Sequence, residues 1–412
     1  MLRRLRNTRA EYPSQFWLLF VGMFISTVGS SMIWPFLSLY VSKKLTLPLT
    51  QAAGLVTINA AMGLIFSFVA GPITDRIGRK WVMVASLFVN GVMYLVMSHA
   101  QTYGMFALCQ AVMGAFNPLY RVGADAMMSD LIPPEQRSSA YSLLRTSNNL
   151  GVAIGPALGG FLVTRSYALV FYLAAAGLIL YSLLILVNAH ETLPQEAAAS
   201  MKGKHMLSGY GHIFRDREFI TFIIAYTLTS MMASTMWVLM PVYTNQHYNI
   251  LESLYGWIPT TNAIMVVAFQ YLVTRVTRRH KPLWVLAAGS AFYVVGTTLV
   301  AVFSGFWGFW LCMVISTVGE LVIVPTATTF TANQAPADMR GRYMSIYNIT
   351  SSIASALAPL FGGLLNDTLG PKMIWYGAGL VGLFSVLAFG FLAVIFKNAG
   401  MHTQAPNRVA SA

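Results

Sequence analysis

The sequence predicts an all-α membrane protein with twelve transmembrane helices in two six-helix bundles. Hydrophobic residues make up 56% of the 412 residues and charged residues only 9%, whereas soluble domains carry about 25% charged residues. Apolar runs of about 20 residues, long enough to cross the hydrocarbon layer of a bilayer, recur along the whole chain. The two halves of the sequence also repeat each other at a constant spacing, which is typical of membrane transporters.

Twelve apolar runs, separated by polar breaks, define the expected spans. They cover residues 16–40, 52–70, 81–98, 103–129, 140–163, 168–187, 219–243, 255–274, 284–303, 306–330, 344–364 and 374–396. The longest polar stretch lies between the sixth and the seventh span. We therefore expect an N-terminal six-helix bundle over 1–187, a central cytoplasmic linker over 188–218, and a C-terminal six-helix bundle with a short cytoplasmic tail over 219–412.

The internal repeat has an offset of 203 residues. It relates Phe16 to Phe219, Trp34 to Trp237, Tyr40 to Tyr243, Trp81 to Trp284, Cys109 to Cys312, Arg137 to Arg340 and Pro156 to Pro359. Because each half has an even number of spans, the halves share one orientation in the membrane. The repeat therefore predicts two bundles related by an axis along the membrane normal, with the substrate path between them.

The net charge of +13 raises the possibility of nucleic-acid binding, but the distribution of the charge indicates topology instead. With the N-terminus inside, 20 of the 26 lysine and arginine residues fall in segments assigned to the cytoplasm and four fall on the other side. This bias predicts a multi-pass protein of the cell (inner or plasma) membrane with both termini cytoplasmic. The expected partners are the lipid bilayer, protons and a small-molecule substrate, without nucleic acid, and we expect a monomer.

The segment between the second and third spans reads Gly71-Pro72-Ile73-Thr74-Asp75-Arg76-Ile77-Gly78-Arg79-Lys80, and we expect a tight loop there because glycine permits sharp turns. Its pattern resembles the signature loop of the major facilitator superfamily. The resemblance implies that its acidic and basic residues lock neighbouring helices in the outward-open state. The gating candidates are Gly71, Asp75, Arg76, Gly78, Arg79 and Lys80. Alternatively, the basic residues serve only inside-positive topology.

The fifth span places Gly151, Gly155 and Gly159 on one helical face, with Pro156 and Gly160 beside them. Small residues let helices approach closely in lipid, and proline can bend the span. This segment resembles the antiporter motif of drug-exporting members of the same superfamily, which favours export over uptake. Simple helix packing is the alternative explanation of the same pattern.

Charged residues inside the fourth and fifth spans are candidates for function, since a charge in a membrane is costly unless it is used or paired. Arg121 and Asp125 lie one helical turn apart and could pair. We expect Asp125 to lie within reach of Arg79 and Arg145, which would add Arg145 to the gate, or to form a static salt bridge. The family's usual arginine on the fourth span is replaced by Gln110, so Arg121 could take over its electrostatic task.

Glu320 is the most informative acidic residue, because it lies near the middle of the tenth span with no basic residue one turn away. A medium of low polarity disfavours the charged form of a carboxyl group. Glu320 could therefore exchange protons, with Asp125 as a second proton-coupling candidate, or it could attract a cationic substrate. A permanently protonated hydrogen-bonding residue is the alternative. Its partner in the repeat is Asn117.

An apolar, adaptable cavity is indicated by the 23 methionines and 53 aromatic residues of the chain. The candidates for its lining are Trp34, Tyr40, Asn117, Arg121, Met236, Trp237 and Glu320. The sequence shows no phosphate-binding loop and no hydrolase motif, so we expect no enzyme activity, no cofactor and no metal site.

The resemblance spans the whole chain and implies a proton-coupled secondary transporter that exports small amphiphilic or cationic molecules by alternating access, as multidrug efflux proteins do. Two alternatives remain. One is a carrier of the same superfamily for a specific metabolite, sugar, peptide or lipid-like molecule. The other, of a different class, is a membrane receptor or scaffold that does not transport.

Overall fold

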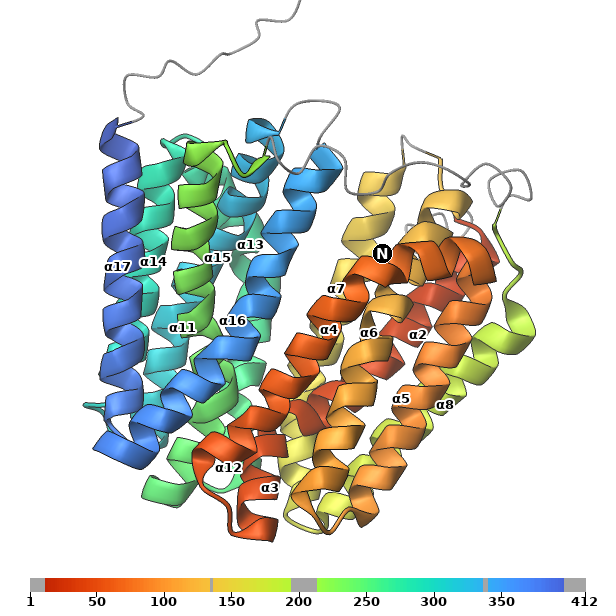
Figure 1. Cartoon of the computed structure of the whole chain (residues 1–412), viewed down its shortest axis with the longest axis horizontal. Helices are drawn as coiled ribbons and strands as arrows, with labels where there is room; N and C mark the ends of the chain where they lie inside the picture. Colours follow the sequence, from red (N-terminus) through yellow and green to blue (C-terminus); the bar gives the residue numbers. More distant parts are fainter. Residues whose placement is uncertain (1–11, 134–135, 194–212, 336–339, 396–412) are drawn as a thin grey trace, which may run out of the picture.

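The computed structural model describes residues 12–133, 136–193, 213–335 and 340–395. Twelve membrane-crossing helical segments form two bundles of six, so the fold class predicted from the sequence is confirmed. The two bundles stand side by side in Figure 1.

The N-terminal bundle begins with a broken span made of α2 (Ser14–Ile33), η1 (Trp34–Phe36) and α3 (Leu37–Leu45). The break follows from Pro35, which has no backbone N–H to donate to the preceding turn. The other five spans are α4 (Leu49–Ile77), α5 (Arg79–His99), α6 (Tyr103–Leu131), α7 (Arg137–Val163) and α8 (Tyr167–Asn188).

The C-terminal bundle also has six spans, but its first span, α11 (Arg217–Tyr248), is continuous. Its other segments are the short α12 (Glu252–Tyr255), α13 (Trp257–Thr277), α14 (Pro282–Leu299), α15 (Gly305–Gln334), α16 (Arg340–Leu369) and α17 (Met373–Ile395). Of the expected central linker, residues 194–212 lie outside the described residues, as does the tail from 396 onward.

Nine of the described helices are long and apolar enough to cross a membrane by length and composition alone. The spans outside this set are α6, α7 and α13, which carry more polar side chains. These include Arg121, Asp125, Arg145 and Asn262. In a bundle, polar side chains at membrane depth are placed toward protein or a polar cavity rather than toward lipid.

The helices extend beyond the apolar runs that mark them in the sequence. The expected loop over 71–80 is largely helical. Helix α4 continues to Ile77, and Gly78 alone separates it from α5. Gly78 has a φ of 105°, which favours glycine. The difference arises because hydropathy marks the end of the hydrocarbon layer, whereas backbone hydrogen bonding continues into the polar region.

The two bundles meet at the end of the molecule that holds α3 and α12, which we call the α12 end. They diverge toward the end where α2 begins and α17 finishes, which we call the terminal end (Figure 1). Hydrogen bonds join the bundles: Thr57 Oγ1 donates to the Ala356 carbonyl at 2.7 Å, and Thr260 Oγ1 donates to the Ala153 carbonyl at 2.7 Å. The contacts therefore run along the helix pairs α4–α16 and α7–α13.

Candidate functional site

Two adjoining cavities lie between the bundles and share Ser351 and Ser355 on α16. The first has a volume of about 250 Å³, and its wall is mainly α11, α14 and α15 of the C-terminal bundle, with Trp34 from the N-terminal bundle. The second has a volume of about 270 Å³ and is lined mainly by α4 and α6. Together they form what we call the central cavity, the place where the repeat predicts a substrate path.

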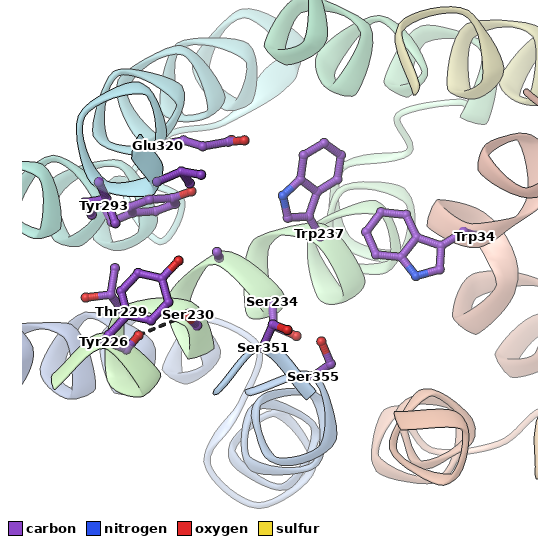
Figure 2. A pocket seen from close by; sticks show the side chains of 13 residues that line it. Trp34, Tyr226, Thr229, Ser230, Ser234, Trp237, Tyr293, Glu320, Ser351 and Ser355 are labelled. Carbon is purple, nitrogen blue, oxygen red and sulfur yellow. Dashed lines mark hydrogen bonds between the residues drawn. The ribbon is translucent and has the colours of Figure 1, made fainter. Parts of the chain in front are cut away.

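Glu320 projects from α15 into the first of these cavities, near Tyr293 and Trp237 (Figure 2). Its Oε2 accepts a hydrogen bond of 2.8 Å from Nδ2 of Asn262 on α13. None of the described ion pairs involves Glu320, although the charge of Arg145 acts on it electrostatically. A carboxyl group held by a neutral amide and open to a cavity can gain or lose a proton without breaking a salt bridge.

Aromatic rings surround this carboxyl group. Trp34 of η1 and Trp237 of α11 approach from opposite bundles, with ring centroids 5.5 Å apart, and Trp34 remains 43% exposed. Tyr226 also lines the cavity, and the hydroxyl of Tyr347 donates to the Tyr226 hydroxyl at 3.0 Å. Such rings offer apolar area and negative π-faces, which suit an organic cation.

The wall formed by α4 and α6 is more polar. Asn117 and Arg121 both line the second cavity. Asn59 Nδ2 donates at 3.1 Å to the side-chain oxygen of Gln110, the residue that replaces the family's usual arginine. Gln110 is therefore a buried packing residue here, and Arg121 is the basic side chain that faces the cavity.

Two other expected cavity residues lie elsewhere. Met236 is buried behind the cavity wall and receives a hydrogen bond from Ser316 at 3.0 Å. Tyr40 was expected to line the central cavity, but it does not. Its ring stacks on that of Tyr167, with ring centroids 4.5 Å apart, and lines a small apolar gap inside the N-terminal bundle. The break at Pro35 carries α3 away from the central cavity toward the α12 end.

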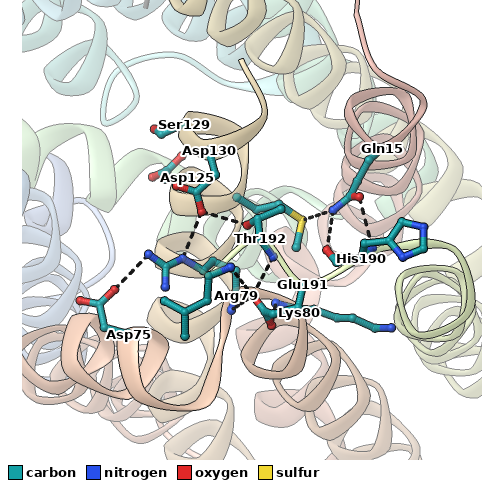
Figure 3. Close-up of polar contacts among 12 residues, drawn as sticks. Gln15, Asp75, Arg79, Lys80, Asp125, Ser129, Asp130, His190, Glu191 and Thr192 are labelled. Atoms are coloured by element: carbon teal, nitrogen blue, oxygen red, sulfur yellow. Dashed lines mark hydrogen bonds and ion pairs between the residues drawn. The ribbon is translucent and has the colours of Figure 1, made fainter. Parts of the chain in front are cut away.

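A charge cluster centred on Arg79 occupies the terminal end of the N-terminal bundle (Figure 3). Arg79, at the start of α5, is only 8% exposed. It pairs with Asp75 of α4 at 3.4 Å and with Asp130 of α6 at 3.2 Å. Glu191, just after α8, accepts from the backbone N–H groups of Arg79 at 2.9 Å and Lys80 at 3.2 Å. A carboxylate at a helix N-terminus is stabilising.

Asp125 is not an ion-pair partner in this cluster, and its expected reach to Arg79 and Arg145 stays a prediction. Among the described residues, Asp125 forms no ion pair with either arginine or with Arg121, although Arg121 acts on it electrostatically. Asp130 takes the place beside Arg79. Asp130 lies five residues after Asp125, about 7.5 Å further along the axis of α6. This places it next to Arg79 at the start of α5.

The remaining members of the signature segment are less engaged. Arg76 is exposed at the end of α4, and Lys80 stacks its ammonium over Trp81 at 5.3 Å. Gly71 lies within α4, with open space where a Cβ atom would be. At Gly78, by contrast, a Cβ atom would collide with the Glu191 carboxylate. Within the described residues, the cluster therefore ties α4, α5, α6 and α8 of one bundle together.

Replacing Asp130 by Asn should lower the thermal stability of the detergent-solubilised protein. The buried guanidinium of Arg79 would lose a charged partner, at a cost of about 1–3 kcal/mol. Differential scanning fluorimetry of Asp130→Asn should show a lower midpoint temperature. The matched control is Arg76→Gln, an exposed change in the same segment. Equal midpoints for the two variants would refute the cluster's stabilising role.

The glycine face of α7 packs closely against α2. A Cβ atom at Gly151 would lie 2.7 Å from Thr27 Cβ, and one at Gly159 would lie 2.8 Å from Met32 Cα. At Gly155 it would overlap Ser31. Gly160 turns toward the other bundle, where a Cβ atom would lie 2.9 Å from the carbonyl carbon of Glu252. The segment around Pro156 thus packs against its own bundle and against α12.

A charged contact joins the two bundles at the α12 end. Lys43 Nζ of α3 lies 2.9 Å from Glu252 Oε1 of α12, and the Tyr167 hydroxyl of α8 donates to the same oxygen at 2.9 Å. Glu252 is only 7% exposed. Nearby, Thr50 donates its backbone N–H and its hydroxyl to Asp367 Oδ2 of α16, at 3.1 and 2.6 Å. These contacts hold the α12 end closed.

Lowering the pH should weaken the contact between the two bundles at the α12 end. Burial alone would raise the pKa of Glu252, but the Lys43 ammonium, the backbone N–H and the Tyr167 hydroxyl together hold the pKa below its ordinary value of 4.5. Because the pKa of Glu252 is lower when the α12 end is closed, the ionised carboxylate stabilises the closed state at pH values above the ordinary pKa. This stabilisation is lost as the pH falls through the lowered pKa. Spin labels on the exposed residues Thr46 and Leu251 should therefore move apart in electron paramagnetic resonance as the pH falls below about 4.5.

The matched control for this pH response is Glu252→Gln. This variant should show the larger separation at every pH, without the acid-dependent step. A distance in the native protein that does not change with pH would contradict the assigned contact.

The fold and the cavity define a class of protein: a multi-pass membrane transporter in which two helical bundles enclose a cavity between them. The family model of the Major Facilitator Superfamily matches residues 19–251 and 222–408. The chain belongs to this superfamily and is a secondary transporter, not an enzyme.

Relatives agree with this assignment, and solved structures share the fold. A Na(+), Li(+), K(+)/H(+) antiporter of Planococcus maritimus is 26% identical over 406 residues, covering 90% of this chain and 93% of the relative. Multidrug resistance protein MdtH of Escherichia coli (strain K12 / DH10B) is 26% identical over 327 residues, covering 78% and 80%. A POT family transporter in complex with 5-aminolevulinic acid superposes with a TM-score of 0.77 at 15% identity, covering 93% and 96%. A mutant of the nucleoside transporter NupG gives a TM-score of 0.79 at 11% identity, covering 92% and 99%.

Proposed function

We propose that this protein is a proton-coupled transporter that exports small amphiphilic or cationic molecules by alternating access. The observation that carries the proposal is the position of Glu320, a carboxyl group that projects into the central cavity among aromatic side chains. Protonation of such a group changes the charge of the cavity by one unit, so a proton and a cationic substrate compete for the same site.

The lining of the cavity supports an amphiphilic cation as cargo. Trp34 and Trp237 supply aromatic faces from the two bundles, and Ser351 and Ser355 supply hydroxyl groups at the junction of the two cavities. Arg121, on the opposite wall, repels the charged end of a cation, which leaves Glu320 as the favoured anchor for it.

An alternating-access mechanism accounts for the difference between the two ends of the molecule. The α12 end is held by Lys43–Glu252 and by Thr50–Asp367, while the bundles diverge at the terminal end. The excess of basic residues in the segments at the terminal end supports a cytoplasmic location for that end and for both termini. We assign this conformation to the inward-open state, and we assign Asp75, Arg79 and Arg145 to the gate that closes the terminal end in the outward-open state.

Two relatives support coupling to protons and a broad substrate range, since one is a cation/H(+) antiporter and another is a multidrug resistance protein. The glycine face over Gly151, Gly155, Pro156, Gly159 and Gly160 supports export through its resemblance to the antiporter motif. Asp125 lies on α6 with an electrostatic tie to Arg121, and we keep it as a second site of proton exchange.

The test is transport by the purified protein in liposomes that contain a pH-sensitive dye. Adding tetraphenylphosphonium, a lipophilic organic cation, should drive protons out of the liposomes in exchange. A specific carrier would instead respond to one class of neutral or anionic metabolite. If no cargo moves protons, the coupling to protons is refuted and the proposal fails.

A further inference from the structure

A small niche lies behind Glu320, separate from the open part of the central cavity. Its volume of about 10 Å³ is close to the space that one water molecule needs. Its lining comes from α11, α13, α14 and α15, and its polar members are Asn262, Tyr293, Ser316, Thr317 and Glu320.

The polar groups of the niche are buried and tightly connected. Asn262 Nδ2 donates to Thr317 Oγ1 at 2.9 Å and to Glu320 Oε2 at 2.8 Å. Thr317 gives its own hydroxyl proton to the Met313 carbonyl at 2.8 Å, so the lone pairs of Oγ1 face the amide. Asn262 and Thr317 are almost completely buried. Burying this many polar atoms at membrane depth is costly unless they have a function.

These groups offer a set of oxygen ligands. The Glu320 carboxylate and the Thr317 hydroxyl both contact the side-chain amide of Asn262. Rotation of that amide by about 180° places its Oδ1 where Nδ2 now lies. Oxygens of Asn262, Thr317 and Glu320 would then all belong to residues that line the niche. Hard cations prefer such ligands, and Na⁺ and K⁺ sites in membrane proteins are built largely from neutral oxygens.

The charge of the niche indicates a monovalent ion. Glu320 is its one carboxylate, and the described residues contain no group of three His, Cys, Asp or Glu side chains that could hold a metal ion of higher charge. The titratable or charged groups that act on Glu320 are Tyr226 of α11, Tyr293 of α14 and Arg145 of α7. The tyrosines are neutral at physiological pH, and Arg145 forms no ion pair with Glu320 among the described residues. The single carboxylate therefore matches one monovalent cation.

We propose that this niche binds a dehydrated monovalent metal cation, of the Na⁺ or K⁺ class, through Glu320, Asn262 and Thr317. The cation takes the place of the Glu320 proton, which leaves for the water of the central cavity, so the net charge of the site is unchanged. The proposal rests on the proton coupling proposed above and adds a second class of cargo to it.

The test uses the purified full-length protein in liposomes of phosphatidylethanolamine and phosphatidylglycerol with an entrapped pH-sensitive dye. NaCl or KCl added outside should drive protons out, whereas sucrose at the same osmolarity, which supplies no cation, should not. Because proton and metal compete for one carboxylate, lowering the pH by about one unit should raise the half-saturating metal concentration by up to about 10-fold.

Thr317→Val removes one oxygen ligand and keeps the shape of the side chain. It should raise the half-saturating metal concentration by about 10-fold or more and leave proton movement driven by tetraphenylphosphonium unchanged. The matched control is Thr331→Val on the same helix. Thr331 is fully buried, and its hydroxyl has no hydrogen-bond partner among the described residues, so this variant should behave as the native protein does.

Each outcome decides the proposal. No response to NaCl or KCl, or an equal response to sucrose, would overturn the metal site while tetraphenylphosphonium-driven proton movement still supports the proposed function. An unchanged metal response in Thr317→Val would mean that the niche holds water only. If Thr317→Val loses both activities, the comparison of NaCl with sucrose in the native protein still decides. If the native protein moves protons neither with NaCl or KCl nor with tetraphenylphosphonium, both proposals are refuted.

Discussion

Replacing Glu320 by Gln should reduce cation-driven proton movement to the background of empty liposomes. Gln is close to Glu in size, and its amide oxygen can still accept the hydrogen bond from Asn262 Nδ2. The variant should therefore fold and insert normally. It cannot release a proton, however, and it places no negative charge in the cavity, so both the coupling ion and the anchor for a cationic substrate are lost.

The measurement is dye-reported proton efflux on addition of tetraphenylphosphonium, with the amount of folded protein checked by size-exclusion chromatography. Glu218→Gln is the matched control, since Glu218 lies at the start of α11 and does not line the central cavity. This control should transport as the native protein does. Flux that persists in Glu320→Gln would show that another group carries the proton.

Replacing Gly160 by Val should keep the α12 end from closing. A Cβ atom at this position already meets backbone atoms of Glu252 and Ser253, and a helix backbone cannot move aside as a flexible side chain can. Overpacking of this kind costs about 1–3 kcal/mol, which corresponds to a shift of about 5- to 150-fold between the two states of the transporter. Transport should fall by a similar factor.

Spin labels on Thr46 and Leu251 report on this shift directly, and Gly160→Val should show the larger separation at neutral pH. Gly390→Val is the matched control, because Gly390 lies on α17 with open space where a Cβ atom would be. A short separation in both variants, with normal transport, would contradict the role given to Gly160.

Much of the fold was predictable from the sequence, because a bilayer imposes a simple rule on it. Helices must supply about 20 apolar residues per crossing, and the repeat that pairs Trp34 with Trp237 and Cys109 with Cys312 indicates two equivalent halves. The ends of the helices were less predictable. The polar residues from Gly71 to Ile77 read as a loop, yet they continue α4, since hydropathy carries no information on backbone hydrogen bonding.

The side-chain partners in the site were harder to predict than the helices. Glu320 stands out in a sequence, because an acid in the middle of an apolar run is rare. Its partner Asn262 does not, since a lone Asn on another span gives no sign of which side chain it meets. Asp130 was missed for a similar reason, because a difference of five residues along α6 decides which carboxylate meets Arg79.

Contacts made by loop and linker residues left the weakest signal. Glu191 reads as part of a polar linker, yet it caps the start of α5. Glu252 reads as a loop residue between two spans, yet it joins the bundles through Lys43. Both depend on how the two halves pack in three dimensions. The charges that hold the two ends of this transporter thus lie outside the apolar runs from which its helices are predicted.

Proton release on cargo binding tests the central claim most directly, because it needs no membrane and no completed transport cycle. The detergent-solubilised protein, in weakly buffered solution at a pH where Glu320 is protonated, should release protons when tetraphenylphosphonium is added. Glu320→Gln should release none. Equal release from the native protein and from Glu320→Gln would contradict the assignment of Glu320 as the group that exchanges a proton for cargo.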